Sequence, residues 1–218
     1  MTKYLDIRKG FKDEKIKEAA EIIKNGGLVV FPTETVYGIG ANAFNEKAVK
    51  KIYEVKRRPF DKPISLLVND LNMIEKVAKN ITKLEYALIK KFCPGPLTIL
   101  LEKKEEIPDI VTANSNIVGV RIPENKSALK LIQYAGVPIA TPSANISGRP
   151  SGTNIGEIRE DFEGKVDLFI DEGESKLGLA STIVQVIDEK PHILRQGVIT
   201  KKEIEEIYLE TEEKIWKI

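Results

Sequence analysis

The chain has 218 residues, of which 42% are hydrophobic and 31% charged, a composition typical of a globular protein with a sizeable core. Its 34 basic and 33 acidic residues argue against binding of nucleic acid over the whole surface. The single Cys93 excludes an internal disulfide and a cysteine-based metal cluster, and the single His192 argues against a zinc site. No apolar run approaches the ~20 residues of a membrane span and no signal-peptide core begins the chain, so we expect a cytoplasmic protein.

The hydrophobic pattern predicts strands and helices in alternation. Helices are expected at residues 13–25, 46–56, 71–78, 82–92, 127–134, 157–162 and 201–208. Strands are expected at residues 28–31, 64–68, 97–101, 117–122, 137–140, 166–170, 182–187 and 192–195. This order favours one α/β domain, residues 1–208, in which helices flank a twisted, mixed sheet. Residues 209–218 are expected to form a C-terminal tail, docked by Trp216.

Two polar loops follow predicted strands and are candidate sites. Residues 141–152 contain two prolines, two glycines, four hydroxyl side chains and Asn145, and residues 32–43, PTETVYGIGANA, form the second loop. Prolines stiffen such loops, and free backbone N–H groups can face a ligand. The same residue types also build ordinary surface turns. The presence of two similar loops favours a recognition site.

Known nucleotide-binding motifs do not fit the sequence. Residues 38–43, GIGANA, match the dinucleotide pattern GxGxxA, but Pro32 to Tyr37 separate them from the preceding strand. Gly164 and Lys165 are followed by Val166, so no Walker A loop forms there. Any nucleotide must therefore be bound in another way.

Cations are concentrated at two places. Lys56, Arg58 and Lys62 surround a proline-bounded turn, where they can converge on phosphate oxygens. By contrast, we expect Lys47, Lys50 and Lys51 to lie on a solvated helix face. Arg121 lies in an apolar strand and needs an anion, either a protein carboxylate or a ligand.

The sequence offers little for nucleophilic catalysis. His192 lies in an apolar strand and Cys93 ends a helix, so both are expected to be structural. Hydroxyls, amides and cations are instead the groups that position substrates and stabilise charge in phosphoryl or nucleotidyl transfer.

Six motifs in order resemble the YrdC family, whose members are threonylcarbamoyl-AMP synthases. They are PTETVYG (residues 32–38), KRRP (56–59), PGPLT (94–98), VRIP (120–123), TPSANISG (141–148) and STIV (181–184). The resemblance implies a YrdC-like fold with a concave, basic-lined site. Lys56 with Arg58, and Ser143 with Asn145, match the KxR and SxN signature of the family and are the expected catalytic residues.

The resemblance also implies a reaction and its substrates. L-Threonine and bicarbonate would form a carbamate that attacks the α-phosphorus of ATP and releases pyrophosphate. A downstream transferase would use the resulting threonylcarbamoyl-AMP to make N6-threonylcarbamoyladenosine in tRNA. Threonine would be bound by Thr35, Arg121, Ser143 and Ser181. ATP would be bound by Lys56, Arg58, Lys62, Ile117 through its backbone, Thr141, Asn145, Ser151 and Arg195. Magnesium is expected on the phosphates, with no dedicated protein ligands.

Two departures from the longer family members bear on this expectation. Leu67 stands where longer members often have histidine, and the chain resembles the short form that has no extra C-terminal domain. Two other functions stay open. One is a module that binds double-stranded RNA or tRNA, and the other is carbamoyl transfer like that of hydrogenase maturation proteins.

Overall fold

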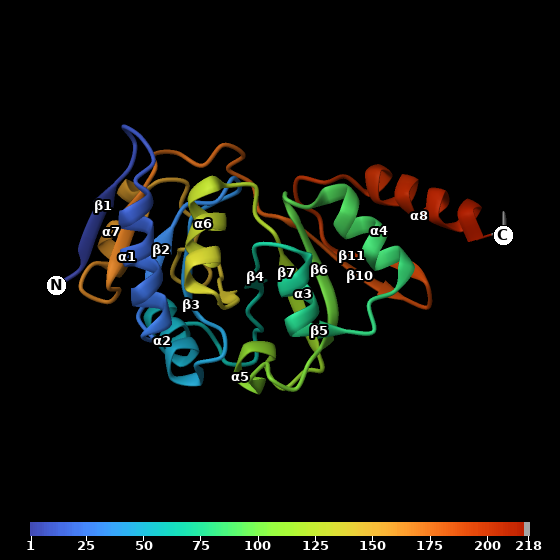
Figure 1. The fold of residues 1–218 in the computed structure, drawn as a ribbon, viewed down its shortest axis with the longest axis horizontal. Helices are drawn as coiled ribbons and strands as arrows, with labels where there is room; N and C mark the ends of the chain where they lie inside the picture. Colours follow the sequence, from blue (N-terminus) through green and yellow to red (C-terminus); the bar gives the residue numbers. More distant parts are fainter. Residues whose placement is uncertain (216–218) are drawn as a thin grey trace.

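The computed structural model describes residues 1–215 (Figure 1). The helices are α1 (Asp13–Lys24), α2 (Glu46–Lys56), α3 (Leu71–Val77), α4 (Lys83–Phe92), α5 (Asp109–Thr112), α6 (Lys126–Ala135), α7 (Ile155–Phe162) and α8 (Lys201–Ile215). The strands are β1 (Lys3–Asp6), β2 (Val29–Phe31), β3 (Gly38–Asn42), β4 (Leu66–Leu67), β5 (Ala78–Lys79), β6 (Leu97–Lys103), β7 (Ile117–Arg121), β8 (Ile139–Ala140), β9 (Leu168–Asp171), β10 (Thr182–Ile187) and β11 (Lys190–Arg195).

The strands form one mixed sheet, which confirms the predicted α/β class. Its order is β1-β9-β2-β3-β8-β4-β7-β6-β10-β11, and β5 pairs with the end of β6. Neighbours are parallel at β1–β9, β2–β9, β4–β7 and β6–β10, and antiparallel elsewhere in this order. Strand β3 pairs with β2 on one side and β8 on the other, so it joins the two halves of the sheet.

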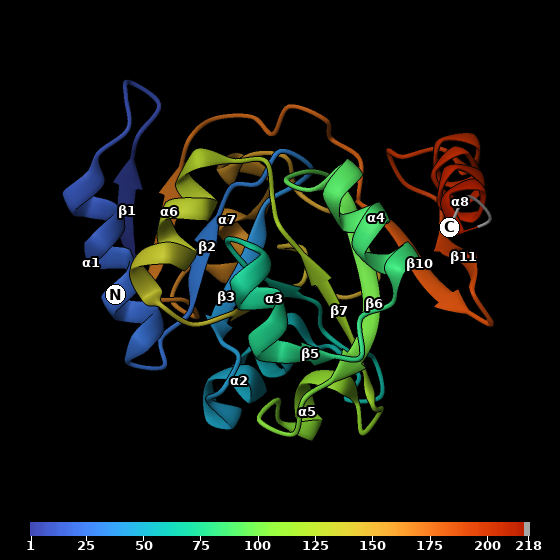
Figure 2. The ribbon, with the colours of Figure 1, turned by 45° about the vertical axis from the view of Figure 1, so that its right-hand side comes forward.

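A pair of helices accompanies each half of the sheet. Helix α1 has a buried stripe of Ile16, Ala19, Ala20 and Ile23, and it packs against α6. Helix α4 packs against α8 beside β10 and β11, at the opposite end of the molecule (Figures 1 and 2). No helix among residues 1–215 has both the length and the apolar character that crossing a membrane requires.

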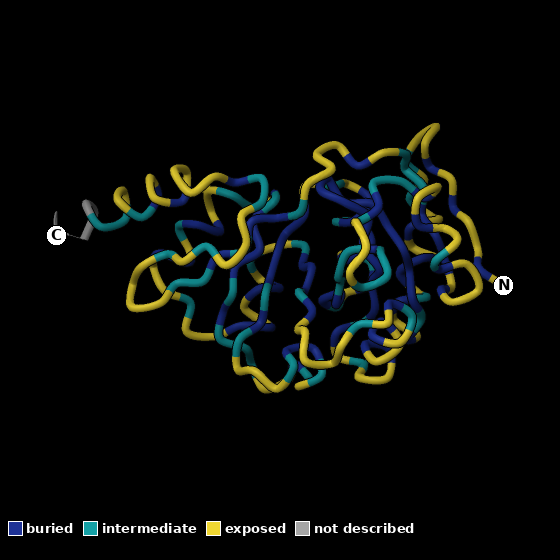
Figure 3. Tube along the Cα trace, turned by 180° about the vertical axis from the view of Figure 1, so that it is seen from behind, coloured by how far each residue is buried: buried dark blue, intermediate teal, exposed yellow. Residues whose placement is uncertain are grey.

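The core is continuous through both halves. Phe31, Ile39, Leu66, Val120 and Ile139, from five different strands, are all fully buried and belong to one hydrophobic cluster. Figure 3 shows buried segments in both halves of the molecule, while exposed residues lie in the loops, on β11 and on the outer faces of helices such as α1 and α8. Burial of this cluster holds the strand ends, and therefore the loops that follow them, in fixed positions.

The prediction of a loop through residues 38–42 is wrong, because these residues form β3. Glycine is unfavourable in strands, yet Gly40 is required here by close packing. A Cβ atom at Gly40 would lie 2.6 Å from both Phe31 and Ile139 side-chain atoms. At Gly38 it would lie 2.5 Å from Cγ2 of Thr141. The glycines therefore let β3 approach the loop after β8.

The predicted end of the last helix at Tyr208 is also wrong, because α8 continues to Ile215. No glycine or proline follows Tyr208 to end the helix. Its first turns carry Lys201–Glu205 and Lys202–Glu206 ion pairs at 3.4 and 4.0 Å. Much of the expected tail is thus helical, and Trp216 lies outside the described residues. Strand β1 and the short helix α5 are further elements that the hydrophobic pattern did not predict.

Candidate functional site

A cavity of about 200 Å³ lies where the ends of several neighbouring strands meet. Four residues near strand ends line the cavity. Thr98 is the second residue of β6, and Ser181 directly precedes β10. Arg121 is the last residue of β7, and Arg195 is the last residue of β11. Strand β6 runs parallel to β10 and antiparallel to β7, and β11 runs antiparallel to β10. These four side chains therefore lie at the same end of neighbouring strands, although they are far apart in the sequence.

The cavity gathers most of the predicted site residues. Its lining includes Thr35, Arg58, Arg121, Thr141, Ser143, Ser151, Ser181 and Arg195. A wider hollow of about 560 Å³ lies along α6, and none of the predicted site residues line it. We assign the site to the smaller cavity because cations and hydroxyls converge there.

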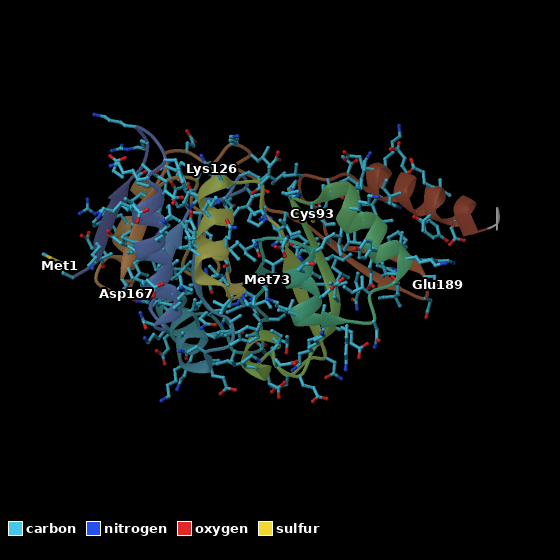
Figure 4. All side chains as sticks on the ribbon, viewed as in Figure 1. Met1, Met73, Cys93, Lys126, Asp167 and Glu189 are labelled. Atoms are coloured by element: carbon cyan, nitrogen blue, oxygen red, sulfur yellow. The ribbon has the colours of Figure 1, made fainter. Side chains whose placement is uncertain are left out.

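Arg121 is held on three sides. Its Nε donates to the carbonyl of Gly95 at 3.1 Å, Nη1 to Oγ1 of Thr35 at 2.9 Å, and Nη2 to Oε1 of Glu34 at 2.6 Å. Gly95 lies in the turn after Cys93, which Figure 4 labels at the end of α4. Arg121 is 7% and Glu34 3% exposed. The protein carboxylate that the sequence left open as a partner is therefore Glu34, and Arg121 still lines the cavity.

Ser181 links two sides of the cavity. Its Oγ lies 2.7 Å from Oγ1 of Thr98, and Nη2 of Arg195 donates to the same Oγ at 3.0 Å. Arg195 also donates to the Ser181 carbonyl from Nε at 3.1 Å and from Nη2 at 2.9 Å. Burial, and secondly the charge of Arg121, lower the pKa of Arg195. One hydroxyl thus connects a cation to a buried threonine.

Lys56 lies behind the cavity and not in its lining. It is 1% exposed, and its Nζ donates to the carbonyls of Ser143 and Asn145, each at 2.5 Å. Burial, with the charge of Arg58 as the second cause, lowers the pKa of Lys56 to about 7. Lys56 therefore clamps the loop after β8 from beneath.

The loop after β8 is also held by its own side chains. Oγ of Ser143 donates to Oδ1 of Asn145 at 2.6 Å. Nδ2 of Asn145 donates to the carbonyls of Ile146 and Arg149 at 3.0 and 2.8 Å. With its hydrogen used in the loop, the Ser143 hydroxyl offers the cavity an acceptor. Lys56 of the KxR signature and Ser143 and Asn145 of the SxN signature thus form one clamped structure.

Arg58 extends along the cavity wall with neutral partners. Its Nε donates to the carbonyl of Lys62 at 3.1 Å and its Nη2 to that of Pro63 at 2.8 Å. Burial is the main cause of its lowered pKa. A partly desolvated guanidinium whose partners carry no charge can interact strongly with an anion.

The structure does not bring every predicted residue into the cavity. The Lys62 side chain is exposed and outside the lining. Ile117 begins β7, at the opposite end of that strand from Arg121. Lys56 and Asn145 are also outside the lining, and both are bonded within the clamped loop.

Sequence reasoning missed several residues at the site. Glu34 holds Arg121, and Thr98 and Ser65 line the cavity. Glu34 lies inside the PTETVYG motif and Thr98 inside PGPLT, so their motifs were the available signal. Leu67, which the sequence singled out as a departure from the family resemblance, also lines the wall.

The described residues offer no ready-made metal centre. Among residues 1–215, no three His, Cys, Asp or Glu side chains are grouped so that they could hold a metal ion. The polar groups that line the cavity are hydroxyls and guanidinium groups. This set suits recognition of anions.

Comparison with known proteins assigns the chain to a family. The sequence model named for Sua5, YciO and YrdC, described as "Telomere recombination", matches residues 21–197. The chain belongs to the Sua5/YciO/YrdC family. This confirms the YrdC resemblance that the six motifs indicated.

Curated relatives carry one common name. The threonylcarbamoyl-AMP synthase of Pyrococcus abyssi is 44% identical over 207 residues, which cover 95% of this chain and 61% of that protein. That of Bacillus subtilis is 41% identical over 196 residues, which cover 89% of this chain and 57% of that protein. The chain thus spans about three fifths of the length of these relatives.

Solved structures agree with this assignment. P. abyssi Sua5 complexed with L-threonine has a TM-score of 0.92 and 44% identity, covering 94% of this chain and 61% of that one. Escherichia coli YciO has a TM-score of 0.84 and 25% identity, covering 94% of this chain and all of that one. Full-length HypF, at 21% identity and a TM-score of 0.74, shares the fold over 84% of this chain and 29% of that one.

Proposed function

We propose that this chain acts as an L-threonylcarbamoyladenylate synthase, a nucleotidyltransferase that makes threonylcarbamoyl-AMP and pyrophosphate from L-threonine, bicarbonate and ATP. The names of the relatives support this activity. The observation that carries the proposal is a single cavity in which Arg121 meets Arg58 and Arg195, with hydroxyls between them. The product would serve a separate transferase that makes N6-threonylcarbamoyladenosine in tRNA.

Arg121 is the proposed partner of the threonine carboxylate. A guanidinium has five N–H donors, and the contacts to Gly95, Glu34 and Thr35 use three of them. One donor therefore remains on each terminal nitrogen. Two donors on neighbouring nitrogens match the two oxygens of a carboxylate. Thr35, Ser143 and Ser181 surround this position and would bind the rest of the amino acid.

Arg58 and Arg195 are the proposed partners of the ATP phosphates. The carbamate oxygen forms a bond to the α-phosphorus, and the bond to the β-phosphate oxygen breaks as pyrophosphate leaves. Negative charge grows on the leaving group, where fixed cations stabilise it. The clamped loop would supply Thr141, Asn145 and Ser151, supported by Lys56, and we propose Lys62 and the Ile117 backbone as outer contacts. No protein nucleophile is required, because the attacking oxygen belongs to the substrate.

Magnesium enters this proposal together with ATP. The cavity wall provides hydroxyl and not carboxylate ligands, so phosphate oxygens and water would supply most of its coordination. When bound, the ion would neutralise phosphate charge. Arg58 and Arg195 would share that role from the protein side.

Pyrophosphate release tests the proposed function. We expect release from ATP only when L-threonine and bicarbonate are both present, because the attacking carbamate needs both. Each is omitted in turn, and the adenylate product is identified by mass. Equal ATP turnover without threonine would contradict the proposal.

A further inference from the structure

A chain of hydroxyl groups runs beneath Arg121, through residues that are almost completely buried. Thr33 is 4% exposed and Thr35 is 0% exposed. Oγ1 of Thr33 lies 2.6 Å from the Val36 carbonyl and 2.8 Å from Oγ1 of Thr35. Nη1 of Arg121 donates to that same Thr35 oxygen at 2.9 Å. Thr35 lines the cavity, whereas Thr33 does not.

Counting hydrogens fixes the direction of this chain. A carbonyl oxygen only accepts hydrogen bonds, so the Thr33 hydroxyl donates its single hydrogen to the Val36 carbonyl. The backbone N–H groups of Thr35 and Val36 also donate to Thr33 Oγ1, at 3.2 and 3.3 Å, so this oxygen acts as an acceptor toward each of these groups. The hydrogen between the two threonine hydroxyls, at the shorter distance of 2.8 Å, then comes from Thr35. Because guanidinium nitrogens only donate, Arg121 cannot accept from Thr35 either. The Thr35 hydroxyl therefore has no hydrogen left for a ligand, and it offers a remaining lone pair.

With the hydrogen bonds in this direction, the cavity contains a hydrogen-bond donor next to a hydrogen-bond acceptor. Arg121 presents N–H donors and Thr35 presents an acceptor, and their own hydrogen bond holds them side by side. An α-amino acid has the matching pair, a carboxylate that accepts and an amino group that donates. A carboxylic acid with neither an amino nor a hydroxyl group on its α-carbon lacks the second group.

We propose that Thr33 is a positioning residue that sets the Thr35 hydroxyl as an acceptor for the α-amino group of the amino-acid substrate. The proposal rests on the proposed function, which supplies the amino acid. Thr33 acts through Thr35 and makes no contact with the substrate itself. Its contribution is selectivity for amino acids over acids that carry no hydrogen-bond donor on the α-carbon.

Binding of two ligands tests this role by titration calorimetry. The probes are L-threonine and 3-hydroxybutyrate, which is threonine without its α-amino group. We expect the wild-type chain to prefer threonine by about tenfold or more, the value of one charge-assisted hydrogen bond. In Thr33→Val the Thr35 hydrogen is released and can turn toward the ligand, so the ratio should fall to about threefold or less. Thr33→Ser keeps the hydroxyl and should restore the preference.

The matched control is Thr2→Val. Thr2 is also a buried hydroxyl, bonded to the Val166 carbonyl at 2.7 Å and the Gly164 N–H at 2.8 Å, beside β1 at the far edge of the sheet. We expect it to lower the melting temperature and leave the ratio unchanged, which separates positioning from a loss of stability.

The outcomes separate the two proposals. If the wild-type chain binds threonine and Thr33→Val keeps the full ratio, Thr33 has no such role and the proposed function stands. If the wild-type chain binds no threonine, both proposals fail. If Thr33→Val does not fold, Thr35→Val against Thr35→Ser gives the same reading: a full ratio in Thr35→Val overturns the inference, and a collapsed ratio restored by serine supports it.

Discussion

Three arginines share the cavity, and their partners distinguish them. Arg121 is neutralised by Glu34 within the protein, at 2.6 Å. Among the residues that the structure describes, Arg195 and Arg58 bond only neutral groups, a serine in one case and two carbonyls in the other. Arg121 is therefore suited to a single negative charge such as a carboxylate, while the positive charges of the other two are not offset by a protein carboxylate and would be available to the phosphates of the proposed substrate.

Arg58→Ala should lower adenylate formation by about 10² to 10³. The reason is that, in the proposed reaction, the guanidinium would stabilise charge that grows as pyrophosphate leaves. Stability without ligand should change by no more than about 1 kcal/mol, because the carbonyls of the exposed residues Lys62 and Pro63 regain water. Initial rates of pyrophosphate release and melting curves, with and without ATP, measure these effects.

Arg57→Ala is the control for Arg58. Arg57 is the exposed neighbour, held in the left-handed region with φ 51° at the C-terminal cap of α2, and it is not part of the cavity lining. The Arg57→Ala variant should keep the wild-type rate of adenylate formation and the wild-type shift in melting temperature with ATP. Equal losses in both variants would show that general positive charge matters here and would exclude a specific clamp by Arg58.

At the scale of elements, β3 depends on the absence of a side chain at Gly40. Gly40→Ala would bring a Cβ to 2.6 Å from Phe31 and Ile139, so we expect a loss of about 3 kcal/mol in the free energy of unfolding. Urea denaturation of the variant measures it.

Gly136→Ala provides the comparison. Gly136 caps α6 with φ 68°, and a Cβ there meets nothing within 4 Å. The change adds only backbone strain, about 1 kcal/mol. If both variants lose the same amount, packing at β3 is looser than the distances imply.

The same elements show how far the sequence could lead. Short apolar runs such as residues 117–122 predicted strands correctly, and glycine correctly marked the end of α6 at Gly136. Strand β3 was missed because glycine normally disfavours strands, and only contacts with Phe31 and Ile139 reveal why it is needed. Local pattern carries no information about such contacts.

The residues of the site were predictable from the sequence, but their hydrogen-bond and ion-pair partners were not. The motifs identified Arg121, Ser143 and Ser181, which all line the cavity. The partner of Arg121 was open because Glu34 lies 87 positions away, and only the folded chain brings them together. Lys56 was predicted at the phosphates, yet its Nζ lies on the loop carbonyls, a distinction that no sequence pattern makes.

Charge at the scale of the whole molecule favours an enzyme over an RNA-binding module. The 34 basic residues are offset by 33 acidic ones. Several exposed lysines are paired within their own helix, such as Lys15 with Glu18 and Lys24 with Glu21. A chain of this kind has little net field to attract a polyanion. Its cations are most useful where they are desolvated, in the cavity.

The continuous sheet and core imply that the described chain unfolds as one unit. Strand β3 joins both halves, and one hydrophobic cluster extends from α1 to α8. We expect a single transition in urea, with far-ultraviolet and near-ultraviolet circular dichroism superimposed. Ile204→Ala tests this, because Ile204 lies on α8 at the far end and is 1% exposed. Its loss of about 2 to 4 kcal/mol should shift both signals together. A far-ultraviolet change that precedes the near-ultraviolet one would show that α8 separates before the rest of the molecule unfolds.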